Sequence, residues 1–259
     1  MTGAAVYRLR AENSARLPMI NGRLMHAVFF KILHEFSPEL EKFVHSELNL
    51  KPFTVSFLEP VGEISSVEER WEVRRGDRFL WRVTGLTAEI LEAAFAVPAG
   101  YEIQAGEIFL SVEKVDTRTA DLIALVRGMA AEAGFEFRFV SPVSFRVDEF
   151  DAPEPRAELI FASLADKWTQ ARMPAAVDKK VIRELALQVR LTEWTGRSRK
   201  FYFAPDRGTL GFWGKFCYDA AALDSDSRKV LMLLAKFAEY AGVGRLCGQG
   251  FGQTRVKFL

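Results

Sequence analysis

Histidine is the side chain best suited to proton transfer near neutral pH, and the three histidines of this chain lie close together. They are His26, His34 and His45, and Lys51 follows soon after. Because the unperturbed pKa of imidazole is about 6.5, one histidine can accept a proton while another donates one. Each well-placed acid or base accelerates a reaction by a factor of about 10²–10⁴, and a lysine can stabilise developing negative charge. The stretch can therefore support acid–base catalysis, although a histidine at a helix edge is more often an ordinary surface or core residue.

The composition narrows the kind of protein that carries these residues. Cys217 and Cys247 lack the CxxC spacing of a zinc site, so we expect both to be reduced and expect no bound metal or other cofactor. With 35 Lys and Arg against 34 Asp and Glu, the net charge is +1, and any basic surface must be local. There is no apolar run of about 20 residues and no recognisable signal peptide, which predicts a cytoplasmic protein without a membrane partner.

The histidines fall on helices of a predicted α+β unit. Apolar residues recur at helical spacing over 20–36, where His26 borders the stripe, and a second short helix begins at Ser37-Pro38 and runs through His45. His34 lies two turns beyond His26, rotated by about 80°, and is expected on the surface. Strands are expected at 4–12, 53–60, on both sides of a turn near Gly76-Asp77 and at 107–115, with a short helix at 89–95. This order of strand, helix, strand, strand, helix, strand is ferredoxin-like.

The second half of the chain repeats a similar inventory. The patterns predict a helix over 120–134, a strand pair over 135–147, a helix over 159–171 and a helix or strand over 180–194. A basic segment (195–203) follows, with a strand, a helix and a last strand over 208–220, 227–241 and 253–259. The predicted fold class is α+β, with two tandem ferredoxin-like (RRM-like) domains covering 1–118 and 119–259. No Ser/Gly-rich linker separates them.

Glycine is concentrated just before the last strand, where it occupies five of the eleven positions from Gly242 to Gly252. The stretch lacks the Gly-Lys-Ser/Thr ending of a P-loop and the third glycine of a dinucleotide fingerprint, and a helix precedes it where both motifs need a strand. Two interpretations remain open. The glycines can cap the helix and form a turn, or they can expose main-chain N–H groups to an anionic backbone, with Arg245 and Gln249 reaching out beside them.

The segment "AEYAGVGRLCGQGFGQTRV" resembles the C-terminal glycine-rich signature of the CRISPR-associated repeat-processing endoribonucleases, members of the repeat-associated mysterious protein superfamily. Further similar segments occur in the same order: "KFVHSELNLKPFTVSFL", "FVSPVSFR", "LIFASLADKW" and "GFWGKFCYD". The resemblance implies two ferredoxin-like domains packed side by side. It also implies metal-independent cleavage of precursor CRISPR RNA within each repeat. The ribose 2′-hydroxyl is the nucleophile, and the products are guide RNAs with 2′,3′-cyclic phosphate and 5′-hydroxyl ends.

The resemblance also assigns roles to residues. His45 stands where the family commonly carries a catalytic histidine, Lys51 where many members have a basic residue, and His26 where members place a second histidine or a tyrosine. We therefore expect His26 and His45 to form the acid–base pair of the first domain, without deciding which is the base, and Lys51 to stabilise charge. The residues expected to bind RNA are, in the glycine segment of the second domain, Gly244, Arg245, Gly248, Gln249 and Gly250 and, in the basic segment, Arg197, Arg199 and Lys200.

The expected partner is CRISPR repeat RNA, both as precursor and as mature guide RNA. Association with subunits of a CRISPR interference complex and formation of a homodimer are left open. One alternative keeps the fold without the reaction: a scaffold subunit of the same superfamily that only binds CRISPR RNA. A second alternative is a small-molecule enzyme that binds a nucleotide at the glycine segment, and the failed phosphate-loop motifs count against it.

Overall fold

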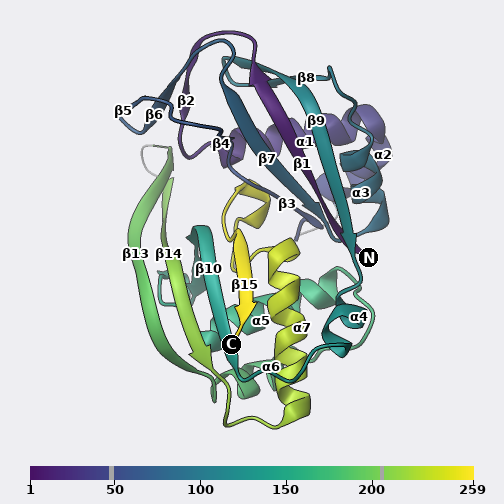
Figure 1. Ribbon diagram of the computed structural model, residues 1–259, viewed down its shortest axis with the longest axis vertical. Coiled ribbons are helices and arrows are strands. Elements are labelled where there is room, and N and C mark those ends of the chain that lie inside the picture. The colour runs from purple at the N-terminus through teal and green to yellow at the C-terminus, as the bar shows by residue number, and fades with distance from the viewer. Residues whose placement is uncertain (47–49, 205–206) are drawn as a thin grey trace. The chain divides into compact units, whose positions relative to one another are not determined.

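The computed structural model describes residues 1–46, 50–204 and 207–259 and consists of two compact units (Figure 1). Unit 1 contains Met1–Ala120 together with Gly248–Gly250, and unit 2 contains Asp121–Cys247 and Phe251–Leu259. The division thus falls after Ala120, where the sequence suggested residue 118. It also groups three residues of the glycine segment with the first unit, although the sequence suggested that the whole segment belongs to the second.

Unit 1 is built on an antiparallel sheet whose strands run in the order β3-β7-β1-β9-β8, with β4 paired to β7. In this sheet β1 lies between β7 and β9, and β3 pairs with β7, which is the strand order of a ferredoxin-like fold. A small sheet, β2-β6-β5, is separate from it. The elements are β1 (Thr2–Ala11), β2 (Ala15–Pro18), α1 (Gly22–Phe36), α2 (Pro38–Ser46), β3 (Phe53–Val55), β4 (Glu59–Pro60), β5 (Ser66–Val67), β6 (Arg70–Val73), β7 (Arg78–Gly85), α3 (Ala88–Phe95), β8 (Glu102–Ala105) and β9 (Ile108–Ala120).

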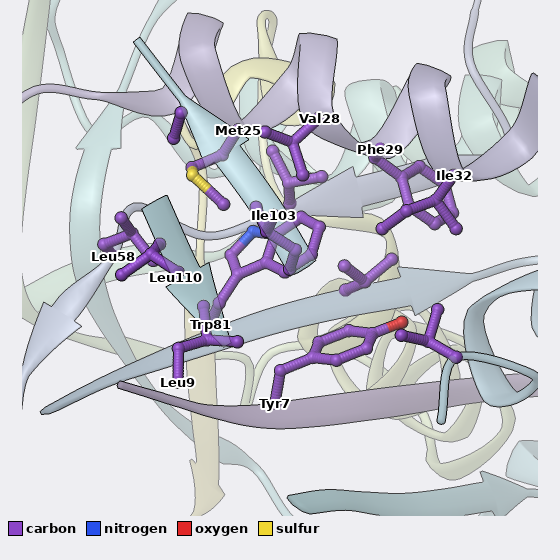
Figure 2. Close-up of a cluster of buried hydrophobic side chains, with 14 of the residues drawn as sticks. Tyr7, Leu9, Met25, Val28, Phe29, Ile32, Leu58, Trp81, Ile103 and Leu110 are labelled. Atoms are coloured by element: carbon purple, nitrogen blue, oxygen red, sulfur yellow. The ribbon is translucent and has the colours of Figure 1, made fainter. Parts of the chain in front are cut away.

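The apolar stripe of α1 forms the core of unit 1 against the sheet. Met25, Phe29 and Ile32 are almost completely buried, and Figure 2 shows them pointing from the helix toward the strands that carry Tyr7 and Trp81. The Tyr7 ring stacks on Trp81 with centroids 4.9 Å apart, and its hydroxyl donates to the main-chain oxygen of Ala94 at 2.5 Å. Tyr7 is therefore a core residue. The packing of this stripe fixes the rotation of α1 and hence the direction in which His26 points.

Unit 2 repeats the same strand order. Its main sheet runs β13-β14-β10-β15, so that the first strand lies between the third and the fourth. A short hairpin, β11-β12, is separate. The elements are α4 (Leu122–Arg127), β10 (Gly134–Val143), β11 (Phe145–Val147), β12 (Phe150–Ala152), α5 (Ala157–Gln170), α6 (Lys179–Ala186), β13 (Arg190–Ala204), β14 (Arg207–Asp219), α7 (Ser225–Ala241), the 3₁₀ turn η1 (Cys247–Gln249) and β15 (Thr254–Phe258). Both units thus confirm the predicted α+β class with tandem ferredoxin-like domains.

Two predicted elements of unit 2 differ in the structure. The helix expected over 120–134 is the short α4, which ends at Arg127. Gly128 follows as its C-cap, and glycine continues a helix poorly. The basic segment at 195–203, expected between strands, lies inside the long strand β13. There Arg197 is opposite Trp213 of β14, and its guanidinium carbon lies 4.7 Å from the centre of the indole ring. Such cross-strand cation–π pairs favour the extended conformation.

No helix in the described part of the chain is both long enough and apolar enough to cross a membrane.

Candidate active site

His26 is held on the surface of unit 1 by a contact distant in sequence. It is half-buried on α1, and its Nδ1 lies 2.7 Å from the main-chain oxygen of Gly248. A carbonyl oxygen can only accept a hydrogen bond, so Nδ1 carries the hydrogen. The neutral ring therefore has an unprotonated Nε2, which can accept a proton from another molecule. The rings of Phe30 and Phe53 pack on the imidazole with centroids at 4.8 and 5.7 Å.

Glycine makes this approach of Gly248 possible. Gly22 is the first residue of α1, and a Cβ atom there would lie only 1.9 Å from the main-chain oxygen of Gln249. Gly250 has a φ of +89°, and a Cβ atom there would lie 2.4 Å from the ring of Phe57. No residue with a side chain fits either position without movement of the main chain or the ring. The sequence reasoning did not identify Gly22 as part of the site.

The environment of His26 lowers the pKa of its imidazole. Burial is the largest cause, and the positive charges of Lys51, His45 and Arg23 act in the same direction, while the bond to Gly248 opposes them. Burial and the nearby positive charges disfavour the imidazolium form, and together they outweigh the bond to Gly248. His26 is thus kept neutral to lower pH than an exposed histidine.

His45 and Lys51 lie together at the C-terminal end of α2. The ammonium of Lys51 donates to the main-chain oxygens of Val44 at 2.7 Å and His45 at 3.1 Å, and burial lowers its pKa. A cation is favourable at this end of a helix. The imidazole of His45 is exposed and packs edge-on against Phe30, with centroids 5.5 Å apart.

The Phe30 ring therefore contacts both His26 and His45. The structure brings His26, His45 and Lys51 into one region of unit 1. The sequence reasoning missed Phe30, although its position one helical turn after His26 is a usable signal. His34 is exposed on α1, with its Nδ1 3.7 Å from Oε2 of Glu41. Residues 47–49, part of a segment that resembles the family, lie outside the described residues.

The predicted RNA-binding residues of the glycine segment make contacts within the protein. The guanidinium of Arg245 pairs with the carboxylate of Asp151 at 3.0 Å, and the Arg245 N–H donates to the main-chain oxygen of Ser144 at 2.9 Å. The Gly244 N–H donates to the hydroxyl of Ser163 at 3.2 Å. Gln249 is half-buried. These contacts hold the segment in a defined conformation.

The basic residues of β13 are exposed and lie beside aromatic rings. The guanidinium carbon of Arg199 lies 4.8 Å from the centre of the Phe201 ring, and the ammonium of Lys200 lies 5.4 Å from that of Tyr202. Phe201 is buried, whereas Tyr202 is 61% exposed. Of these two aromatic residues, Tyr202 is therefore the one that can stack on a base, and Arg197 is exposed on the same strand.

Within residues 1–46, 50–204 and 207–259, no three His, Cys, Asp or Glu side chains are grouped so that they could hold a metal ion.

Comparison with solved structures first concerns the fold. The chain resembles a Cas6 product complex (25% identity, TM-score 0.73, 99% of this chain and 100% of that chain). It also resembles Thermus thermophilus Cas6 (24% identity, TM-score 0.72, 99% of this chain and 98% of that chain). A Cas6-related protein from Pyrococcus furiosus matches at 14% identity and a TM-score of 0.67, covering 99% of both chains. These likenesses show that the chain has the fold of the Cas6 structures, with two ferredoxin-like units.

The sequence comparisons then indicate the family. A model of the family described as CRISPR-associated endoribonuclease Cas6 matches residues 137–254. A Mycobacterium tuberculosis protein named "CRISPR-associated endoribonuclease Cas6" is 27% identical over 190 residues, which is 69% of this chain and 59% of that protein. The chain thus matches less than two thirds of the length of this relative. Together the comparisons support the Cas6 repeat-processing family, the one whose signature the sequence resembles.

Proposed function

We propose that the protein is a metal-independent endoribonuclease that cleaves precursor CRISPR RNA within the repeat and releases guide RNAs. One observation carries this proposal: Nδ1 of His26 is bound to the Gly248 carbonyl 2.7 Å away, so its Nε2 is left unprotonated. His45 and Lys51 lie in the same region of unit 1 as His26. The names of similar proteins support it, since the curated relative is called an endoribonuclease and solved neighbours are described as product and substrate-mimic complexes.

RNA carries its own nucleophile, so the protein needs only to move protons and stabilise charge. In the proposed reaction, Nε2 of His26 accepts the proton of the 2′-hydroxyl next to the scissile phosphate. The 2′-oxygen then forms a bond to phosphorus while the bond from phosphorus to the 5′-oxygen breaks. A protonated His45 gives its proton to the leaving 5′-oxygen. The products are a 2′,3′-cyclic phosphate and a 5′-hydroxyl, and the atoms balance without water or a metal ion.

The environments of the two histidines support this division of roles. A general base must be neutral at the working pH, and the lowered pKa of His26 favours its neutral form. His45 is exposed at the C-terminal end of α2, so its imidazole is accessible to a substrate. Lys51, bound to that same helix end, supplies positive charge for the extra negative charge at phosphorus.

Binding of the repeat is assigned to two groups of residues. Arg197, Arg199 and Lys200 of β13 hold phosphates, and Tyr202, which lies beside Lys200, stacks on an unpaired base. In the glycine segment, Arg245 and Gln249 contribute together with the main chain of Gly244, Gly248 and Gly250.

The test is incubation of the purified protein with labelled CRISPR repeat RNA in excess EDTA. The variants are His26→Ala and His45→Ala, with His34→Ala as the matched control, because His34 is an exposed histidine on the same helix as His26. A repeat with a 2′-deoxy nucleotide at the cut site tests the nucleophile.

The proposal is supported if the wild type cleaves the RNA in EDTA and does not cleave the 2′-deoxy substrate. The cleavage rate should fall about 10²–10⁴-fold in His26→Ala and in His45→Ala, and it should be unchanged in His34→Ala. Cleavage that requires a divalent ion, or that survives the 2′-deoxy substitution, contradicts the mechanism. Tight binding without any cleavage by the wild type favours the scaffold alternative.

A further inference from the structure

A buried lysine lies at the start of the glycine segment. Lys167 of α5 is only 4% exposed, in a helix whose neighbouring residues Leu164 and Trp168 are fully buried. Lysine is almost never fully buried unless its charge has partners, because the loss of hydration is unfavourable. A lysine at this position therefore requires a specific set of acceptors.

Three acceptors surround its ammonium group, and they lie at the C-terminal end of α7 and in the segment that follows it. Nζ donates to the main-chain oxygens of Ala241 at 3.1 Å and Gly242 at 2.8 Å, and to Sγ of Cys247 at 3.0 Å. The two carbonyls are at the C-terminal end of α7, where a cation complements the helix dipole. One side chain thus connects the first and the last residue of the stretch 241–247.

The same stretch is fixed at two further points. Ser163, one turn before Lys167 on α5, accepts a hydrogen bond from the Gly244 N–H at 3.2 Å. Cys247 Sγ is enclosed by glycines, since a Cβ atom would lie 2.9 Å from it at position 242 and 2.8 Å from it at position 252. The path of the main chain into residue 248 is therefore defined by α5 and by the cysteine sulfur.

We propose that Lys167 is a positioning residue for the reaction. It fixes Cys247, and Cys247 is followed directly by Gly248, whose carbonyl binds Nδ1 of His26. Lys167 acts through this carbonyl: it keeps His26 in the tautomer with hydrogen on Nδ1 and directs Nε2 outward. The expected effect on cleavage rests on the proposed function, whereas the effect on the tautomer does not.

The experiment uses the full chain with Lys167→Met, which keeps the buried stem and removes the donor. Lys229→Met is the matched control, because Lys229 is a half-buried lysine of the same unit whose ammonium donates to the main-chain oxygens of Val126 and Met129. One arm measures single-turnover cleavage and the Kd for repeat RNA. The other records the ¹⁵N spectrum of the imidazoles without RNA. With three histidines in the chain, His26→Ala is enough to assign the signal of His26.

In Lys167→Met we expect cleavage to be slower by about 10–100-fold, because small displacements at a reacting group have effects of this size. His26 changes from the pure Nδ1–H signature to a mixture of tautomers, and this readout separates the proposed role from an effect on the Kd. Lys229→Met behaves as the wild type. A folded Lys167→Met protein that keeps the wild-type His26 signature overturns the proposal, as does one that loses only thermal stability.

If Lys167→Met does not fold, Cys247→Ala replaces it, since this variant leaves Lys167 its two carbonyl acceptors and removes the group next to Gly248. An unchanged His26 signature in this variant overturns the proposal. If the wild type itself does not cleave RNA, the proposed function fails, and the spectra still decide whether Lys167 controls His26.

Discussion

The substitution Gly22→Ala tests whether close contact between α1 and the glycine segment is needed for activity. Gly22 is buried at the first position of α1, and its nearest neighbour across the contact is main chain, not a flexible side chain. An added Cβ atom would lie 1.9 Å from the Gln249 oxygen and 2.5 Å from its carbonyl carbon. Since real Cβ contacts are essentially never below 3.0 Å, the main chain must move by about 1.1 Å.

This movement sets the size of the expected effects. Overpacking of this kind lowers the free energy of unfolding by about 1–3 kcal/mol. For a chain of this size, 1 kcal/mol changes the Tm by about 2–4 °C, so the Tm should fall by roughly 2–12 °C. Gly248 is next to Gln249, and a similar shift of its carbonyl lengthens the 2.7 Å contact with His26 beyond hydrogen-bonding distance. A misplacement of about 1 Å at a reacting group can slow a reaction by about 10²-fold.

The assay compares the Tm and the single-turnover cleavage of repeat RNA at a temperature where every variant is folded. Gly128→Ala is the control, because an added Cβ there would lie 3.8 Å from its nearest neighbour. A wild-type Tm for Gly22→Ala would refute the packing argument. A lowered Tm with wild-type cleavage would refute the link between the glycine segment and the chemistry of His26.

Four further predictions follow from the site. Burial and nearby positive charges lower the pKa of His26, and a general base must be neutral to act. The acidic limb of the pH–rate profile should therefore lie below about pH 6.5. A limb at or above that value would contradict the assignment of His26 as base. Gly248→Ala should fold normally, since its Cβ would lie 3.5 Å from the His26 ring. A raised Kd for repeat RNA in this variant would indicate that RNA approaches Gly248, and an unchanged Kd would argue against such an approach. Arg197→Gln and Arg199→Gln should each reduce the slope of log K against log[salt] by about 0.7–0.9, and an unchanged slope would mean that neither side chain holds a phosphate. Arg245→Gln should lower the free energy of unfolding by about 1–2 kcal/mol through loss of its pair with Asp151, and a denaturant titration that matches the wild type would disprove this.

Much of the fold could be predicted because its signals are local. The apolar spacing over 20–36 and the turn near Gly76-Asp77 are properties of short stretches, and the order of such stretches indicates a ferredoxin-like unit. The errors arose where tertiary pairing decides. The basic segment at 195–203 carries charges typical of a loop, yet β14 supplies partners along its whole length, and residues such as Trp213 stabilise it as a strand.

The candidate site also contains residues that the sequence can predict and a contact that it cannot. His26, His45 and Lys51 are near one another in sequence, and two consecutive helices can bring such residues together. The contact between His26 and Gly248 joins residues 222 positions apart, and no local pattern reveals it. Lys167 did leave a signal, because it lies three residues after Leu164 and seven after Ile160, on the apolar stripe of α5. A charged residue on a buried stripe must have a partner, although the sequence does not say which.

The glycines near the C-terminus have a purpose that does not depend on RNA. Positions 242 and 252 leave room for the sulfur of Cys247, and Gly250, which has a positive φ, leaves room for the ring of Phe57. At each of these positions a side chain would collide with the protein itself, so an abundance of glycine is not by itself evidence for a nucleic-acid contact. Gly248 differs, because a Cβ there meets only ordinary contacts. If a side chain at position 248 impairs function, packing within the protein does not explain the effect. Such a result would point to a ligand that approaches Gly248.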